Sequence, residues 1–404
     1  MHDPVREVET PYSWLRLGVA TLLSTLGGVG LWSGVVALPV VQAEFAVARG
    51  EASLPYTLTM LGFGVGGMVI GRLVDRFGIA RPLAVAAITL GLGYIAAGSA
   101  DSLWQFALAH GLLIGIGSAA TFAPLIADIS HWFSRRRGTA VALCATGNYI
   151  AGTFWPPVLE HFIRVDGWRA THLGVGVFCI LTMVPLALSL RRPSPHLAAA
   201  ALGPARARQH GLGLSPGALQ VALMIAGLAC CMAMAMPQVH IVAYCGDLGY
   251  GATRGAQMLS LMLGFGIVSR VASGFVADSI GGFGTLLLGS ALQGTALLFY
   301  LLFNGLTSLY VISALFGLFQ GGIVPSYAVI VREYFPPQEA GTRVGSIIMA
   351  TVVGMALGGW TSGAIFDLTG SYRAAFANGL AWNVLNVAIT IWLLMRQRRP
   401  VALA

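Results

Sequence analysis

The chain has 404 residues, of which 56% are hydrophobic and only 9% are charged, and its mean hydropathy is +0.78. Soluble domains carry about 25% charged residues, so this composition excludes an ordinary soluble protein and indicates many membrane spans. The formal net charge is +8, but the arginines cluster between apolar runs without a basic stripe or an aromatic platform, which argues against nucleic-acid binding.

Apolar windows long enough to cross a bilayer, about 20 residues each, predict twelve transmembrane helices. The first begins near Trp14 and is too long for a signal peptide, so we expect it to remain in the mature protein. The expected fold class is an all-α membrane protein. The approximate limits of the spans are 14–40, 52–74, 82–100, 104–128, 139–163, 169–190, 216–243, 254–277, 283–303, 308–331, 341–366 and 374–395.

The distribution of arginine between the spans predicts the orientation in the membrane. One set of connections, together with the C-terminal tail, carries most of the arginines, and the opposite set carries few. Cytoplasmic loops are enriched in basic residues, so both termini should be cytoplasmic, and we expect a multi-pass protein of the cell inner membrane. The rich set contains Arg72, Arg76, Arg81, Arg135, Arg136, Arg137, Arg191, Arg192, Arg206, Arg208, Arg332, Arg343, Arg396, Arg398 and Arg399.

A tandem repeat divides the chain into two halves. The stretch from Gly71 to Gly78 recurs from Gly274 to Gly281, and Gly138-Thr139 recurs as Gly341-Thr342, with one offset (274 − 71 = 203 and 341 − 138 = 203). We therefore predict two pseudo-symmetric six-helix bundles, 1–190 and 216–404, joined by a cytoplasmic linker, 191–215. Transporters built in this way place the substrate site between the halves near the membrane midplane.

Arg270 is the most informative single residue, because it lies inside an apolar run long enough to span the bilayer. A charge near the middle of a span costs about 2.5–3.5 kcal/mol and normally faces a bundle interior or a watery cavity. Every acidic residue lies in a loop, in a tail or near a helix end, so we expect an anionic substrate to supply the counter-charge. The alternative is that Arg270 bonds helix carbonyls or reaches Asp128 or Asp278.

The loop after the second span carries a motif that identifies a family. Gly71-x-Leu73-x-Asp75-Arg76-x-Gly78-x-x-Arg81 resembles the signature of the major facilitator superfamily, and the resemblance covers the whole chain. We expect Gly71 to allow two helices to approach, Asp75 to cap a helix or pair with arginine, and Gly78 to close the turn. The resemblance implies that these residues, with Asp278 in the second copy, govern conformational change and do not touch substrate.

Within that superfamily the chain is similar to the monocarboxylate and oxalate/formate transporters. The resemblance rests on Gly115-x-Gly117, on His131 to Ala140, on Gly147-Asn148, and on Gly167-Trp168-Arg169. It implies that Arg270 is the arginine that binds the substrate carboxylate. Two positions depart from the family pattern. Gly266 stands where an aspartate shares in proton coupling, so proton symport is in doubt. His110-Gly111 stand in the fourth span where an arginine is common, which weakens a cation-binding role for that span.

Five further residues are candidates for the substrate site, each with a structural alternative. Asn148 lies halfway along the fifth span and either contacts substrate or bonds a neighbouring helix. His240 belongs to a vestibule or is an ordinary interfacial histidine. We expect Tyr327 and Gln320 to face Arg270 and Phe122 to line the cleft. The alternative is that all three residues pack in the core. Possible cavity-lining aromatics are Tyr149, Tyr244 and Trp382.

The function that these observations favour is secondary transport of a small organic anion, in particular a monocarboxylate, by alternating access. A proton or a counter-anion is the expected co-substrate, the lipid bilayer is the environment, and a monomer suffices. The alternative is transport or export of another small molecule, such as a vitamin, an aromatic compound or a drug. Protease and hydrolase motifs are absent from the sequence, so we do not expect an enzyme.

The five cysteines give no sign of a metal site. They lie in or beside apolar runs without metal-ligand spacing, and we interpret them as small packing residues. We therefore expect neither a metal nor another cofactor. These residues are Cys144, Cys179, Cys230, Cys231 and Cys245.

Overall fold

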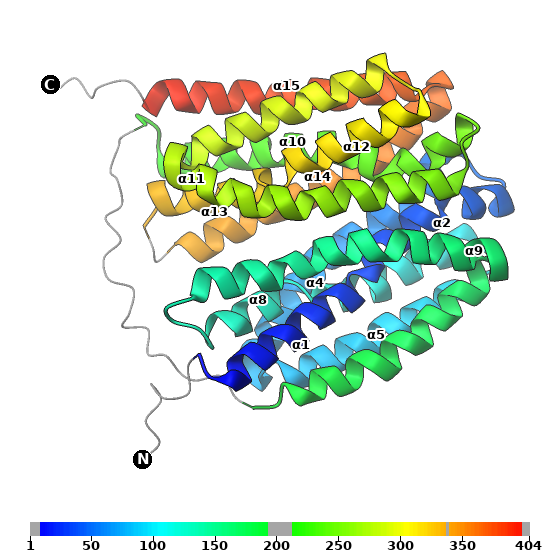
Figure 1. The fold of residues 1–404 in the computed structure, drawn as a ribbon, viewed down its shortest axis with the longest axis horizontal. Helices are drawn as coiled ribbons and strands as arrows, with labels where there is room; N and C mark the ends of the chain where they lie inside the picture. The colour runs from blue at the N-terminus through cyan, green and yellow to red at the C-terminus, as the bar shows by residue number, and fades with distance from the viewer. Residues whose placement is uncertain (1–8, 193–211, 337–338, 398–404) are drawn as a thin grey trace, which may run out of the picture. The chain divides into compact units, whose positions relative to one another are not determined.

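The computed structural model describes residues 9–192, 212–336 and 339–397, and these residues form helices and short connections (Figure 1). Most of the predicted linker, 191–215, lies outside the described residues. The helices of the first half are α1 (Pro11–Gly27), α2 (Val29–Phe45), α3 (Arg49–Ala52), α4 (Leu54–Phe77), α5 (Ala80–Gly98), α6 (Leu103–Leu108), η2 (Ala109–Gly115), α7 (Ile116–Ala119), α8 (Ala123–Ser130) and α9 (Arg137–Ser189). Those of the second half are α10 (Pro216–Asp247), α11 (Ala252–Leu302), α12 (Leu306–Gln320), α13 (Ile323–Tyr334), α14 (Ala340–Thr369) and α15 (Tyr372–Gln397).

Ten helical segments in the described residues are long and apolar enough to cross a membrane. Two of them, α9 with 53 residues and α11 with 51, are about twice the length that a bilayer requires. Each contains one glycine with non-helical dihedral angles, Gly167 in α9 and Gly281 in α11, where the chain reverses direction (Figure 1). Counting each leg separately gives twelve bilayer-length segments, in agreement with the sequence.

The turns preserve the internal repeat. Gly78 and Gly281 both have φ +74°, and they are separated by the predicted offset (281 − 78 = 203). Gly167 and Gly370, with φ of +82° and +65°, show the same separation (370 − 167 = 203). Residues with a side chain rarely adopt this left-handed region, so glycine at these four positions is a backbone requirement. The expectation that Gly78 closes the turn is confirmed, since its N–H bonds the carbonyl of Val74 at 2.9 Å.

The chain folds into two compact units. Unit 1 contains Met1–Leu202 together with Val242–Leu263, and unit 2 contains Gly203–Ile241 and Gly264–Ala404. The end of α10 and the start of α11 therefore belong to the first unit. Within it, Asp247 accepts two hydrogen bonds from the guanidinium of Arg49, at 3.1 and 3.2 Å, and Glu160 accepts one from the hydroxyl of Thr253 at 2.6 Å. These contacts fasten the α10–α11 connection to unit 1.

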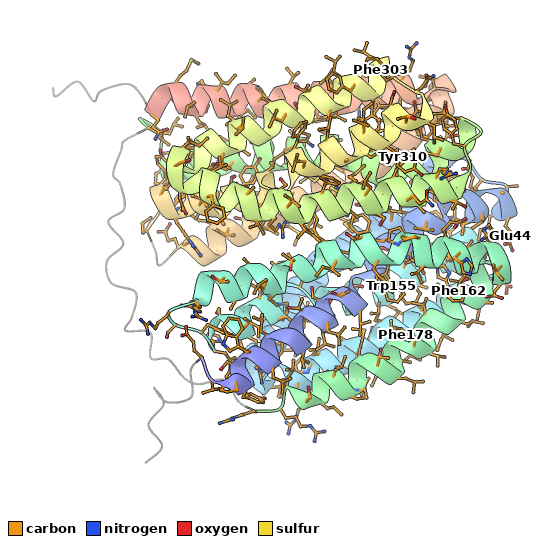
Figure 2. The ribbon with its side chains drawn as sticks, viewed as in Figure 1. Glu44, Trp155, Phe162, Phe178, Phe303 and Tyr310 are labelled. Atoms are coloured by element: carbon orange, nitrogen blue, oxygen red, sulfur yellow. The ribbon has the colours of Figure 1, made fainter. Side chains whose placement is uncertain are left out.

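Unit 1 is held together by close helix crossings as well as by aromatic packing. Figure 2 shows the aromatic side chains Trp155, Phe162 and Phe178 on the two legs of α9, of which Trp155 donates its indole N–H to the Thr25 carbonyl at 2.9 Å. At the crossing of α4 with η2, a Cβ atom added to Gly62 would collide with the carbonyl oxygen of Gly111. Small residues permit this approach between membrane helices.

Substituting Gly62 with alanine should therefore destabilise unit 1 by about 1–3 kcal/mol, as overpacking of a dense interior does. Gly67 lies on the same helix, and a Cβ there would meet nothing within 4 Å, so Gly67→Ala is the matched control. Thermal unfolding of the detergent-solubilised protein measures the difference. We expect a lower melting temperature for Gly62→Ala alone, and equal melting temperatures for the two variants would contradict the close crossing.

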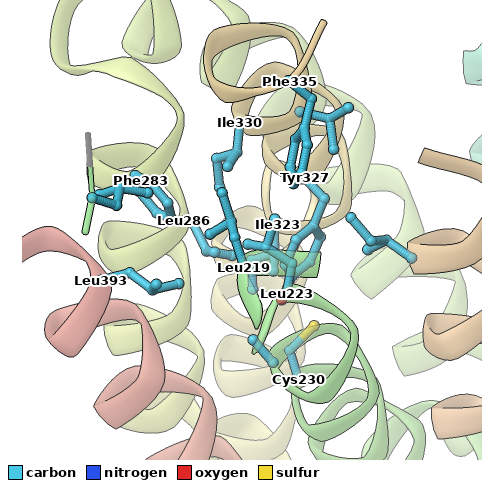
Figure 3. Close-up of a cluster of buried hydrophobic side chains, with 14 of the residues drawn as sticks. Leu219, Leu223, Cys230, Phe283, Leu286, Ile323, Tyr327, Ile330, Phe335 and Leu393 are labelled. Atoms are coloured by element: carbon cyan, nitrogen blue, oxygen red, sulfur yellow. The ribbon is translucent and has the colours of Figure 1, made fainter. Parts of the chain in front are cut away.

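The core of unit 2 is a cluster of buried aliphatic and aromatic side chains contributed mainly by α10, α11 and α13 (Figure 3). Tyr327 lies within this cluster and is fully buried, and its hydroxyl donates to Asn386 Oδ1 at 3.5 Å. The exposed apolar side chains on the outer faces, such as Leu368 and Phe275, suit a lipid environment. The cluster contains Leu212, Leu219, Leu223, Ala226, Cys230, Cys231, Phe283, Leu286, Ile323, Tyr327, Ile330, Val331, Phe335, Ile347 and Leu393.

Candidate functional site

Unit 1 contains a narrow pocket with about 160 Å³ of empty volume, and in this structure it has no room for a water molecule. Two of the residues predicted from the sequence, Phe122 and Asn148, lie together in its wall although 26 positions separate them in the chain (148 − 122 = 26). We call this the unit-1 pocket. Its lining residues are Ser24, Gly28, Leu31, Phe63, Ser118, Thr121, Phe122 and Asn148.

The fourth span shapes this pocket because it is not a regular helix. It passes through the π-helical turn η2, and α7 ends at Ala119 before α8 begins. Phe122 lies at the interruption with φ −121° and ψ −91°, and Pro124 follows in the first turn of α8. Single π-helical turns are frequent at functional sites, and proline at a helix start costs no hydrogen bond. The interruption turns the Phe122 ring to within 6.3 Å of the Phe63 ring, centroid to centroid.

Two polar atoms of the pocket have no hydrogen-bond partner among the described residues. They are Ser118 Oγ and Asn148 Oδ1, and both atoms are buried. Thr121, by contrast, donates its hydroxyl to the Ser118 carbonyl at 2.7 Å. A buried polar atom without a partner costs about 1–3 kcal/mol, so each such atom in a native structure calls for an explanation. The pocket therefore offers hydrogen bonds beside the apolar walls of Leu31, Phe63 and Phe122.

In unit 2, Arg270 lies on the first leg of α11 and is half-buried. The helix around it packs tightly on the junction between α12 and α13. A Cβ atom added to Gly321 would come within 2.6 Å of the Gly266 carbonyl and 2.7 Å of Ser269 Cβ, and one on Gly322 would collide with Ser273. The tenth span is thus interrupted at Gly321-Gly322, as the fourth span is at Thr121-Phe122. Both halves of the repeat therefore carry a broken helix.

The other predicted residues of unit 2 lie in its interior. Gln320 is buried, and its Oε1 accepts a hydrogen bond from the Gln238 side chain at 2.9 Å, while its Nε2 has no partner in the described part of the chain. His240 is fully buried, with Nε2 2.8 Å from the Gly359 carbonyl and Nδ1 3.4 Å from the Tyr372 hydroxyl. His240 and Tyr327 therefore have contacts that favour their structural alternatives, and we do not retain them as proposed substrate contacts.

The motif residues are mostly at the surface. Asp75, Arg76, Arg81 and Asp278 are exposed. The expected role of Gly71 in a close helix approach is not seen in this structure, because a Cβ atom there would meet nothing within 4 Å. Arg81 borders a groove with apolar residues of α4 and α5.

Sequence analysis named Asp128 as a possible partner of Arg270. In the structure, Asp128 is bound by Arg16 of α1. The guanidinium donates two hydrogen bonds to the carboxylate, at 2.8 and 2.9 Å, and only 1% of Arg16 is exposed. It also lies over the Trp132 ring at 4.6 Å. Sequence analysis did not identify this pair, nor Ser118 or Gln238. The only signals in the sequence were that Arg16, Ser118 and Gln238 lie within apolar spans.

Comparison with known proteins agrees with this architecture. A sequence model of the Major Facilitator Superfamily matches residues 20–309 and 285–403. Monocarboxylate transporter 13 of Bos taurus is 30% identical over 350 residues, which cover 82% of this chain and 79% of that protein. MFS-type transporter pynF of Aspergillus niger is 26% identical over 309 residues, covering 75% of this chain and 69% of its own length. A bacterial homolog of the human lysosomal transporter Spinster, solved in an inward-facing and unoccupied conformation, shares the fold with a TM-score of 0.70 over 96% of both chains at 16% identity.

The family match and the relatives identify a multi-pass membrane transporter and not an enzyme. The chain belongs to the Major Facilitator Superfamily. The resemblance to monocarboxylate transporters noted in the sequence is confirmed.

Proposed function

We propose that the chain is a secondary transporter that carries a small monocarboxylate across the membrane by alternating access. The position of Arg270 carries this proposal. It precedes the turn at Gly281 by 11 residues (281 − 270 = 11), or about 16 Å of helix. That is about half the thickness of the hydrocarbon core, so the guanidinium lies near the midplane of the bilayer. Charges at this depth mark substrate or ion pathways.

The chemistry of the guanidinium indicates the class of cargo. Its planar fork of N–H donors matches a carboxylate in a bidentate geometry, and such charge-assisted bonds are about twice as strong as neutral ones. A monocarboxylate carries one negative charge and the guanidinium one positive charge, so the complex of the two has no net charge.

Competition for uptake tests the preference for carboxylates. Purified protein in proteoliposomes is given labelled L-lactate together with an excess of an unlabelled competitor, and flux through empty liposomes is subtracted. Lactate, pyruvate and propionate should reduce the labelled uptake, whereas lactamide and propionamide, which have the same shapes without charge, should not. Equal competition by the amides would exclude the carboxylate as the recognised group.

A second candidate function keeps the fold and changes the cargo to another small molecule, such as an aromatic compound or a drug. The observation that favours it is the apolar wall of Leu31, Phe63 and Phe122 in the unit-1 pocket. In the competition assay this function gives inhibition by neutral aromatic solutes and none by short carboxylates.

Replacing Asn148 with alanine should lower uptake about tenfold, because a hydrogen bond to cargo is worth about 1.5 kcal/mol. The variant should raise the KM for lactate with an unchanged melting temperature. Thr182→Ala, on the second leg of α9, is the control, since its hydroxyl bonds only its own helix. A lower melting temperature with a normal KM would support the helix-packing alternative.

We also propose that the protein lies in the cell inner membrane with both termini in the cytoplasm. The support is the concentration of arginine in one set of connections. A fluorescent protein that matures only in the cytoplasm, fused after Ala404, should fluoresce in whole cells, and a dark fusion that is fully expressed would reverse the orientation.

A further inference from the structure

A groove between α4 and α5 lies on the outer surface of unit 1 and has more room than the unit-1 pocket. Its cavity volume is about 320 Å³, and the fourth span closes it from behind. We call it the α4–α5 groove. Its lining residues are Val69, Ile70, Leu73, Phe77, Arg81, Pro82, Val85, Ala86, Thr89, Ile116 and Gly117.

The groove exists because α4 and α5 both pack closely on the fourth span. A Cβ atom added to Gly66 of α4 would come within 2.8 Å of Ile116 Cα. One added to Gly117 would come within 2.8 Å of the Ala86 carbonyl oxygen of α5. Small residues thus hold both helices against α7. Ile116 and Gly117 form the floor of the groove, and the two helices form its walls.

The walls are apolar and have the length of one membrane leaflet. Leu73 and Phe77 of α4 and Val85 of α5 are between 41% and 62% exposed, which suits contact with acyl chains. From Arg81 to Thr89 the helix α5 advances eight residues (89 − 81 = 8), or about 12 Å. Half of the hydrocarbon core is about 15 Å thick. The groove therefore runs from one membrane surface most of the way to the midplane.

A cation lies at the outer end of the groove. Arg81 is the one charged residue of its lining, it is exposed, and within the described part of the chain its guanidinium has no hydrogen-bond or ion-pair partner. Helix α5 begins one residue earlier, without a side-chain cap or an acidic residue in its first turn, so the positive end of the helix dipole adds to this charge. The segment 71–81 contains three arginines and one aspartate, Asp75, for a net charge of +2 (3 − 1 = 2).

We propose that the α4–α5 groove binds an anionic phospholipid from the leaflet on the arginine-rich side of the membrane. One acyl chain lies along the apolar walls, and the lipid phosphate accepts hydrogen bonds from the Arg81 guanidinium. The planar guanidinium matches a phosphate in a bidentate geometry, and basic residues at the membrane surface attract anionic headgroups. The site does not depend on the nature of the cargo.

The second half of the chain lacks the cation. With the offset of 203, the counterpart of Phe77 is Ile280 and the counterpart of Arg81 is Gly284 (77 + 203 = 280 and 81 + 203 = 284). The repeat thus keeps an apolar side chain at the first position and has no guanidinium at the second. We therefore expect one anionic lipid site in each chain.

Native mass spectrometry of the detergent-solubilised protein with added lipid tests the anion contact. The wild type should retain one dioleoyl phosphatidylglycerol in preference to dioleoyl phosphatidylcholine, a zwitterionic lipid with the same chains. Arg81→Gln should weaken binding of phosphatidylglycerol at least about tenfold, because it removes charge-assisted hydrogen bonds. Arg72→Gln is the matched control, since Arg72 is exposed on the same end of α4 but does not line the groove.

A second pair of variants tests the place of the acyl chain. Thr89→Trp fills the inner part of the groove and should weaken binding of both lipids. Ile88 is the neighbouring residue on α5, is 40% exposed and does not line the groove, so Ile88→Trp should bind lipid as the wild type does. Melting temperatures measured without added lipid establish that the variants are folded.

The wild type alone also decides the proposal, which keeps the test independent of how the variants fold. Phosphatidylglycerol should raise its melting temperature with increasing lipid concentration, as a ligand of the native state does, and phosphatidylcholine should raise it less. Equal effects of the two lipids, or unchanged phosphatidylglycerol binding in folded Arg81→Gln, would overturn the anion site. Unchanged binding in folded Thr89→Trp would overturn the groove as the place of the lipid chain.

Discussion

Substitution of Arg270 with alanine is expected to lower carboxylate uptake by at least about thirtyfold while the protein still folds and reaches the membrane. Removing one partner of a buried charge pair costs about 2–5 kcal/mol, and 2 kcal/mol corresponds to about thirtyfold. Arg270→Lys should also be strongly impaired, because an ammonium group lacks the planar fork that binds both carboxylate oxygens. Initial rates of lactate uptake in proteoliposomes measure both effects.

Arg254 provides the control for this experiment. It lies on the same helix, α11, but it is exposed near the beginning of that helix, so Arg254→Ala should keep nearly wild-type uptake. Size-exclusion chromatography and thermal unfolding establish that the Arg270 variants are folded. Wild-type uptake by folded Arg270→Ala protein would remove the residue from the substrate pathway.

Substitution of Arg16 with alanine is expected to destabilise unit 1 by about 3–5 kcal/mol. It leaves the Asp128 carboxylate buried, with its bidentate partner removed, and an uncompensated buried charge is among the most costly single changes. Asp128→Ala should have a similar effect for the same reason. Thermal unfolding in detergent should show a large fall in melting temperature for both variants.

The double variant Arg16→Met/Asp128→Leu should recover most of this loss, because an apolar pair carries no desolvation penalty. Glu339→Ala is the control, since it breaks an exposed ion pair with Arg343 and should cost no more than about 1 kcal/mol. Single variants at Arg16 and Asp128 that melt at the wild-type temperature would show that this pair does not stabilise the bundle.

Much of the fold follows from the sequence because its signals are local. An apolar run of about 20 residues is enough by itself to predict a membrane span, and the repeated motif predicts that the chain has two similar halves. The turn at Gly78 was also predictable, since glycine in that motif serves a backbone conformation that other residues rarely adopt. The long helices α9 and α11 were predicted as separate spans, and their reversals occur at Gly167 and Gly281.

The side-chain contacts were harder to predict because they depend on which face of each helix is turned inward. His240 and Tyr327 were candidates on the basis of residue type, and only the packing of α14 and α15 shows that their polar atoms contact protein groups. The pairing of Arg16 with Asp128 joins residues 112 positions apart, and no local pattern reports such a contact. Ser118 was missed because a serine in a membrane helix commonly bonds its own backbone.

Counterflow in proteoliposomes tests carboxylate transport by alternating access most directly. Liposomes preloaded with unlabelled lactate are diluted into a trace of labelled lactate, so that any labelled accumulation must come from exchange through one site that faces each side in turn. The wild type should accumulate the label transiently above its outside concentration, and liposomes preloaded with lactamide should not. Absence of counterflow with lactate, pyruvate and propionate in a folded, reconstituted protein would contradict the carboxylate carrier.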